Sequence, residues 1–122
     1  MLTPYEVAQK AVQVLDSKKA RDITVLKTEK VTSLADYFII VTASSSTHGK
    51  TLVEETEKQL SEAGEPPLRR EGYRSGSWVL LDFGCVVIHV FLEETRRFYN
   101  LERLWSDATE IDYTTMLEED KE

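Results

Sequence analysis

Hydrophobic positions recur along this chain with two different periods, and the change of period locates the expected secondary structure. Apolar residues three or four positions apart predict a helix over about residues 4–18. Thr3 and Glu6 supply the two halves of a capping box at its start. A second helix is expected after residues 44–47, all of which are serine or threonine and can cap it, and Gly64 supplies its C-terminal stop.

Runs rich in β-branched and aromatic residues predict the strands. Phe83-Gly84 predicts a tight hairpin between the last two runs. The helical pattern then resumes from Glu93 to Trp105, with an expected break near Asn100. The expected strands are Ile23–Leu26, Leu34–Ala43, a weaker one at Leu68–Arg70, Trp78–Asp82 and Cys85–Leu92. This order of elements predicts an α/β (α+β) fold with a mixed sheet of about five strands, in which the first two helices cover the sheet.

Composition and length favour one globular domain. The chain has 122 residues, of which 41% are hydrophobic and 30% charged. The longest apolar run, Val86–Leu92, is interrupted by His89 and is too short to span a bilayer, so no membrane association is expected. The N-terminus has no signal or transit pattern and the single cysteine, Cys85, fits a reducing compartment. We therefore expect a cytoplasmic protein, with the mature form of an imported protein as the alternative.

The charge balance bears on the class of partner. A net charge of −7 argues against extensive contact with nucleic acid, because proteins that grip phosphate backbones present a basic face. An acidic protein is instead attracted to a basic protein partner, by an interaction that weakens as salt rises.

The sequence offers little material for catalysis or metal binding. With two histidines and one cysteine it has no metal-ligand spacing, and neither a metal nor a cofactor is expected. Cys85 and His89 are expected on one face of one strand, about 13 Å apart, which is too far for a nucleophile and its base. We interpret Cys85 as a buried structural residue and His89 as a packed or interface residue.

The order of elements also allows a nucleotidyltransferase fold. Such enzymes carry a Gly-Ser pair followed by two acidic residues one position apart, which hold metal ions. Gly76-Ser77 and Asp82 are present, but Gly84 stands where the second carboxylate is needed. Glu110 and Asp112 have the right mutual spacing but follow the last expected helix. We therefore do not expect an enzyme.

The most distinctive stretch runs from Trp78 to Trp105. Strand alternation places Trp78, Leu80 and Asp82 on one face of the hairpin and Val79 and Leu81 on the other. Both faces of the hairpin are apolar, so both should be covered, one by the protein's own helices and the other by helices or by a partner.

An aromatic and aliphatic group follows within eight residues and is surrounded by arginine and acidic residues. Aromatic residues and arginine ringed by charge are typical of interface hot spots, but aromatic residues also dominate cores, and both interpretations stay open. The group consists of Phe98, Tyr99, Leu101, Leu104 and Trp105.

Two stretches together resemble the ribosomal silencing factors of the Iojap family. The first combines Ala20-Arg21-Asp22-Ile23 with Leu34-Ala35-Asp36-Tyr37-Phe38, and the second runs from Trp78 into Arg97-Phe98-Tyr99-x-Leu101-Glu102-x-Leu104-Trp105. The resemblance covers about residues 4–109. It implies a silencing-factor domain over residues 1–109 with a nucleotidyltransferase-like fold that lacks the catalytic acids. Residues 110–122 would form an acidic C-terminal tail, expected to fray from Met116 onwards.

The resemblance also implies a function. Members of the family are expected to bind the large ribosomal subunit through its fourteenth protein, a basic partner, and to repress translation by sterically blocking the small subunit. It also implies a homodimer off the ribosome, while the net charge of −7 adds the expectation of little or no direct contact with nucleic acid. A large-subunit assembly factor and, less favoured, a degenerate nucleotidyltransferase remain as alternatives.

Mapped onto this sequence, the resemblance gives a candidate docking surface. Its aromatic residues would be apolar anchors and its two carboxylates would meet basic groups. The competing interpretation is core packing for each aromatic residue, and for Asp82 a turn residue that caps its own backbone. The predicted surface consists of Trp78, Leu80, Asp82, Tyr99, Leu101, Glu102 and Trp105.

Overall fold

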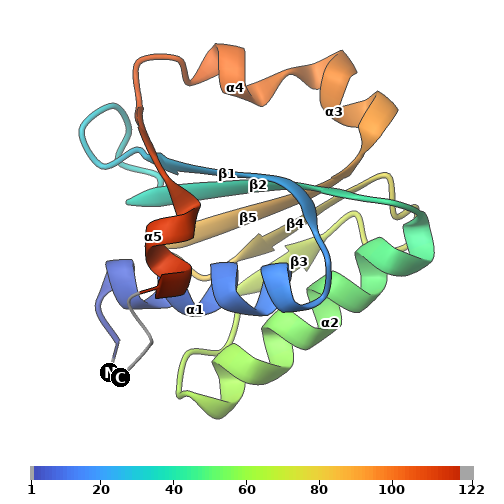
Figure 1. The fold of residues 1–122 in the computed structure, drawn as a ribbon, viewed down its shortest axis with the longest axis horizontal. Coiled ribbons are helices and arrows are strands. Elements are labelled where there is room, and N and C mark those ends of the chain that lie inside the picture. Colours follow the sequence, from blue (N-terminus) through green and yellow to red (C-terminus); the bar gives the residue numbers. More distant parts are fainter. Residues whose placement is uncertain (1, 119–122) are drawn as a thin grey trace.

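The computed structural model describes residues 2–118 and shows a mixed sheet with helices on both faces (Figure 1). The helices in this part of the chain are α1 (Pro4–Ser17), α2 (Ser46–Glu62), α3 (Glu93–Tyr99), α4 (Leu101–Leu104) and α5 (Tyr113–Glu118). The strands are β1 (Arg21–Lys27), β2 (Tyr37–Ala43), β3 (Arg69–Glu71), β4 (Trp78–Asp82), β5 (Val86–Leu92) and β6 (Thr109–Ile111). The predicted α/β (α+β) fold is thus confirmed.

The sheet has the strand order β3-β4-β5-β2-β1-β6. The two central strands, β2 and β5, run parallel to each other, and every other neighbouring pair is antiparallel. Every residue of β2 is buried. This agrees with its position, because a strand at the centre of a sheet that is covered on both faces has no polar side.

One face of the sheet is covered by α1, α2 and α5, which lie together beneath it in Figure 1. The apolar stripe of α1 is buried against the strands, and the capping box between Thr3 and Glu6 is formed. The backbone amide of His48 donates to the Ser45 side chain at the start of α2, and Gly64 follows the end of that helix with a φ of +90°. The predicted starts and stops of both helices are confirmed.

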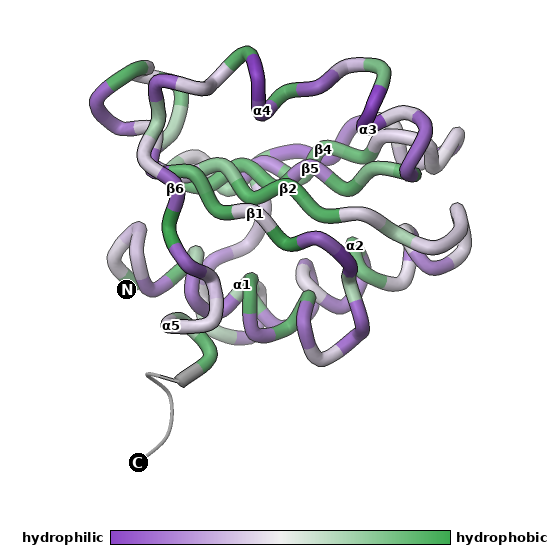
Figure 2. The backbone as a smooth tube through the Cα atoms, turned by 45° about the horizontal axis from the view of Figure 1, so that its top comes forward, coloured by the Kyte–Doolittle hydropathy of each residue, from purple (hydrophilic) through white to green (hydrophobic). Residues whose placement is uncertain are grey.

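The other face is covered by α3 and α4, which lie above it (Figures 1 and 2). Neither of these short helices contains a fully buried residue. They are separated at Asn100, which adopts the left-handed conformation (φ 50°, ψ 58°), where the break was predicted. Beneath them lies a second, smaller cluster of buried residues, formed by Leu26, Ala35, Phe38, Ile40, Val87 and Phe91.

The structure differs from expectation before β2 and near the C-terminal end of the described chain. Leu34 was predicted to begin a buried strand but is 69% exposed, because β2 starts only at Tyr37. The expectation that the chain frays from Met116 is wrong for Met116 itself, whose side chain is fully buried in the core. Ile111 in β6 pairs with Val25 in β1, which ties this segment to the sheet. The rest of the expected tail, residues 119–122, lies outside the described residues.

The expected placement of Cys85 and His89 on one face is also wrong. Cys85 packs against the core on the α1 and α2 side, whereas His89 lies on the α3 and α4 side beside Phe38. The reason is that Cys85 precedes β5 in the turn and does not follow the alternation of that strand. It is partly exposed, and its carbonyl accepts hydrogen bonds from the amides of Asp36 and Tyr37.

Candidate docking surface

A hollow of about 290 Å³ lies between β4, β5 and the segment from Leu101 to Trp105 that contains α4, and we call it the Trp78 hollow. Five of the seven predicted docking residues line it, so the structure brings most of the predicted surface together. The lining residues are Leu34, Phe38, Arg69, Trp78, Leu80, Asp82, Val87, His89, Leu101 and Trp105. Apolar and aromatic side chains dominate this lining, and a few polar groups are placed among them, which is typical of a binding site.

The Trp78 indole is held on several sides. Its ring stacks on Phe91 at a centroid distance of 4.9 Å and lies 4.6 Å from the ring of Tyr99. Its Nε1–H donates a hydrogen bond to Nδ1 of His89 over 3.1 Å. Tyr99 does not line the hollow but is 50% exposed beside it. Trp78 and Tyr99 therefore form a continuous aromatic surface that is packed on one side and open on the other.

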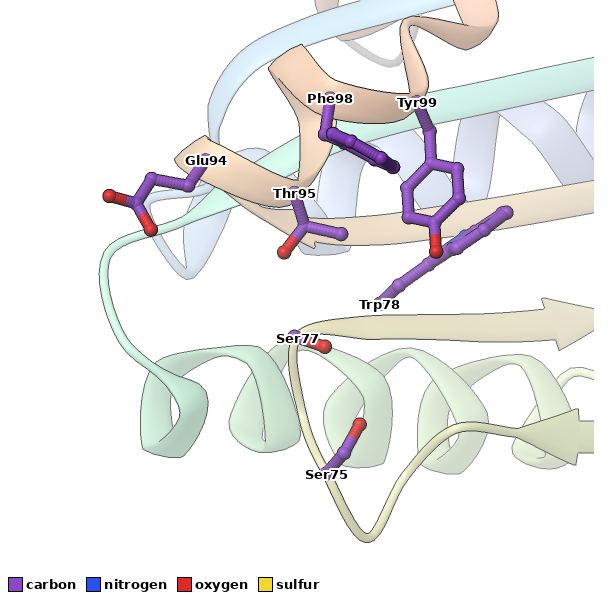
Figure 3. Close-up of a pocket in the computed structure, with 7 residues that line it drawn as sticks. All are labelled: Ser75, Ser77, Trp78, Glu94, Thr95, Phe98 and Tyr99. Atoms are coloured by element: carbon purple, nitrogen blue, oxygen red, sulfur yellow. The ribbon is translucent and has the colours of Figure 1, made fainter.

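A second depression adjoins this aromatic pair, with a volume of about 560 Å³ (Figure 3). Figure 3 shows Phe98 and Tyr99 on α3 above it, Trp78 at its wall, and Ser75 and Ser77 on the opposite side. Phe98 is 80% exposed, and its ring meets that of Tyr99 edge to face at 5.0 Å. The exposed apolar surface thus continues past the Trp78 hollow onto α3.

The two predicted carboxylates already have partners within the chain. Asp82 accepts hydrogen bonds from the Gly84 amide at 2.7 Å and from Nε of Arg69 at 3.1 Å. The first of these bonds is the turn-capping contact that was the alternative interpretation of Asp82. Glu102 does not line the Trp78 hollow, and it accepts hydrogen bonds from Nε and one terminal nitrogen of Arg96 at 3.0 and 2.6 Å.

Arg96 is the residue that attaches α3 and α4 to the sheet. Besides Glu102, its guanidinium donates to the Asp22 carbonyl, to Oγ1 of Thr42 and to Oγ1 of Thr24, each within 3.0 Å. These bonds join α3 to β1, β2 and α4, and they hold the helix pair over the second core cluster. The sequence alone did not indicate this role of Arg96, because three of its four partners, Asp22, Thr24 and Thr42, lie more than 50 positions away.

His89 is the most perturbed ionisable group of this surface. It is 5% exposed, and its ring lies between those of Phe38 and Trp78, at centroid distances of 5.3 and 6.0 Å. Burial lowers the pKa of His89 to about 4, because the charged form is poorly solvated there. Its Nε2 atom is buried and has no hydrogen-bond partner among residues 2–118.

Residues from distant segments complete the surface and were missed by sequence reasoning. Leu34 comes from the segment that leads into β2, Phe38 from β2 itself, and Arg69 from β3. The strong apolar character of residues 34–43 identified a strand but did not indicate which of its side chains face α4. Large apolar side chains that are exposed within the described chain are Val31, Leu34, Leu68, Phe98, Tyr99 and Leu104.

The structure places the Gly-Ser pair considered for nucleotidyltransferase chemistry in a packed turn. Gly76 is buried, and its α-carbon faces Ser46 of α2 so closely that a side chain would collide with it. Within residues 2–118, no three acidic, histidine or cysteine side chains lie close enough together to hold a metal ion. In the same part of the chain, no helix is both long and apolar enough to cross a membrane.

Comparison with known proteins agrees with this architecture. The sequence matches the family described as "Ribosomal silencing factor during starvation" (RsfS) over residues 2–122. It is 38% identical over 111 residues to the ribosomal silencing factor RsfS of Halalkalibacterium halodurans, covering 91% of this chain and 95% of that protein. It is 36% identical over 98 residues to the mouse "Mitochondrial assembly of ribosomal large subunit protein 1", covering 78% of this chain and 43% of that protein.

A solved structure shows the same fold. The crystal structure of a protein from Chromobacterium violaceum superimposes with a TM-score of 0.84 at 38% identity, covering 86% of this chain and 88% of that one. The sequence match extends over the whole described structure, including β6 and α5, which the motif resemblance did not reach. The chain therefore belongs to the ribosomal silencing factor (RsfS) family.

Proposed function

We propose that this protein represses translation by docking on the large ribosomal subunit through the fourteenth protein of that subunit. The bound protein would then occupy a surface that the small subunit needs for joining. The mechanism requires affinity and bulk, and no chemical step. Membership of the silencing-factor family supports the ribosomal role, and the Trp78 hollow supports the choice of surface.

The observation that carries the choice of surface is the concentration of exposed apolar side chains around one face. Phe98, Tyr99, Leu104 and Leu34 are each at least half exposed, and they lie on or beside the segments that frame the Trp78 hollow. Exposed apolar patches of this kind are typical of protein–protein interfaces. A packed tryptophan with one open side matches the aromatic anchors that dominate binding energy at interfaces.

The charges of the surface suggest how a basic partner would be recognised. Asp82 is paired with Arg69 and Glu102 with Arg96, so the negative charge of each carboxylate is already partly neutralised within the chain. We therefore expect attraction through the net charge of −7, which raises the association rate, rather than through one desolvated ion pair. Apolar contacts of the aromatic anchors would supply most of the affinity.

Co-sedimentation with isolated large subunits, followed by addition of small subunits and counting of joined ribosomes, tests the proposal. The wild-type protein should bind and reduce joining, and the double variant Trp78→Ala/Tyr99→Ala should do neither. Tyr73→Ala is a matched control, because Tyr73 packs against the opposite face of the sheet and donates to Glu54 of α2. Binding of the double variant with wild-type affinity would refute the surface, and no binding of wild-type protein would refute the function.

A second function, in large-subunit assembly, is favoured by the name of the mouse relative, a mitochondrial assembly protein of the large ribosomal subunit. The same docking surface would serve it, but the outcome would be maturation rather than silencing. Depletion of the protein distinguishes the two. Accumulation of immature large subunits would support assembly, whereas normal subunits that join too readily under starvation would support silencing.

A further inference from the structure

We propose that His89 is a positioning residue that fixes the Trp78 indole in the orientation needed for docking. This inference rests on the proposed docking surface and gives a role to a residue of its lining that is only 5% exposed. It concerns how the surface is prepared before binding.

Ring contacts alone do not fix the orientation of Trp78. Phe91 at 4.9 Å and Tyr99 at 4.6 Å restrict the tilt of the indole plane, but an aromatic stack tolerates sliding and rotation within that plane. The hydrogen bond from Nε1–H of Trp78 to Nδ1 of His89, at 3.1 Å, removes this freedom. It fixes the polar edge of the indole toward His89 of the neighbouring strand β5.

The same bond fixes the state of His89. Because Nδ1 accepts a hydrogen bond, the ring is neutral and its proton is on Nε2, where no partner is available among residues 2–118. A buried donor without a partner lowers stability. All other residues of β5 are aliphatic or aromatic, so an apolar side chain of similar size would suit this position better for packing alone. What histidine supplies, and an aliphatic residue cannot, is the acceptor for Trp78.

The surroundings support a rigid arrangement. Phe38 packs against both His89 and Trp105, at ring distances of 5.3 and 5.2 Å, and this places a second aromatic wall opposite Trp78. Phe38 is held in place by these contacts, whereas Trp78 could rotate if the hydrogen bond to His89 were absent. Rotation of the indole would then change the width of the hollow between Phe38 and Trp78. Pre-organising an anchor in this way raises affinity by reducing the entropy lost on binding.

Two variants of His89 test the proposal. His89→Leu removes the acceptor and keeps an apolar side chain, whereas His89→Gln keeps an acceptor oxygen. We expect His89→Leu to melt close to the wild-type temperature, because loss of the unpaired Nε2–H offsets the loss of the acceptor for the Trp78 N–H. We expect the same variant to bind the large subunit roughly tenfold more weakly, and His89→Gln to restore much of the binding. A purely structural role would instead lower the melting temperature of the leucine variant.

Nuclear magnetic resonance tests the positioning independently of the ribosome. The Trp78 indole N–H signal, assigned with Trp78→Phe, should show scalar coupling to Nδ1 of His89 in the wild-type protein. Its hydrogen exchange should be at least tenfold faster in His89→Leu. Absence of the coupling, or wild-type affinity in a folded His89→Leu variant, would overturn the inference. If wild-type protein fails to bind the subunit, the proposed function fails, and the coupling and exchange still decide whether His89 positions Trp78.

Discussion

Lowering the pH from 7.5 to 5 should destabilise this protein through one buried group, His89. The folded protein holds the pKa of His89 at about 4, whereas the unfolded chain has the ordinary value of 6.5. At a pH between these two pKa values, His89 is protonated in the unfolded chain but neutral in the folded protein. The contribution of neutral His89 to stability is therefore complete above pH 6.5 and is lost as the pH falls toward 4.

The size of the effect follows from the two pKa values. Each pH unit over which only the unfolded state is protonated costs about 1.4 kcal/mol, so full protonation would cost about 3 kcal/mol. At pH 5 the folded ring is still mostly neutral and the unfolded ring is mostly charged, which corresponds to a loss of about 2 kcal/mol relative to pH 7.5. This is a substantial fraction of the stability of a small domain.

Urea unfolding of the wild-type protein and of His89→Leu at half-unit steps between pH 7.5 and 5 measures this effect. The difference between the two free energies of unfolding isolates His89, because every other ionisable group is present in both proteins. We expect this difference to change by about 2 kcal/mol, with the wild-type protein losing stability faster on acidification. Parallel curves over the whole range would show that the ring can be protonated without unfolding, and would refute the reasoning.

Three further predictions concern the packing that stabilises the fold. Arg96→Ala should lower the free energy of unfolding by about 2 kcal/mol, because it leaves the buried Oγ1 of Thr42 and the partly buried acceptors of Thr24 and Glu102 without their donor. The neighbouring Arg97→Ala, at a 73% exposed side chain, should change it by less than about 0.5 kcal/mol in the same urea titrations. Gly72→Ala should lower the melting temperature far more than Gly64→Ala. Both glycines have a positive φ, but only at Gly72 would a methyl group collide with the backbone of β4. Equal shifts of the melting temperature would contradict this prediction. Met116→Ala should cost about 2–3 kcal/mol in urea unfolding, as expected for a fully buried side chain, and a change near zero would show that α5 is not part of the core.

Most of the fold could be predicted because its central elements are long and strongly patterned. The patterns of three elements indicate which of their faces are buried: the apolar stripe of α1, the continuous apolar run of β2 and the alternation of β4. These patterns leave few ways to pack the elements together. Short elements could not be predicted in this way. β6 has three residues and owes its position to pairing with β1, and Met116 is held through its carbonyl by Gln9 and Gln13 of α1. Such contacts depend on tertiary structure and leave no periodic signal.

The candidate surface was predictable only where it lies along one hairpin and the segment that follows. Alternation placed Trp78 and Leu80 correctly on the face opposite Val79 and Leu81, and the structure shows the first pair around the second core cluster. The charged residues were less predictable. The sequence cannot show that Glu102 is paired with Arg96, because an acidic residue near an arginine can equally be free at a surface.

The two edges of the sheet have a consequence for how the protein avoids unwanted self-association. The outer strands, β3 and β6, have three residues each, and both include charged side chains: Arg69, Arg70 and Glu71 in one, Glu110 in the other. Short, charged edges offer too few unpaired backbone groups for another chain to extend the sheet. A protein that exposes large apolar side chains on one face can therefore remain free of edge-to-edge aggregation while that face stays available for a partner.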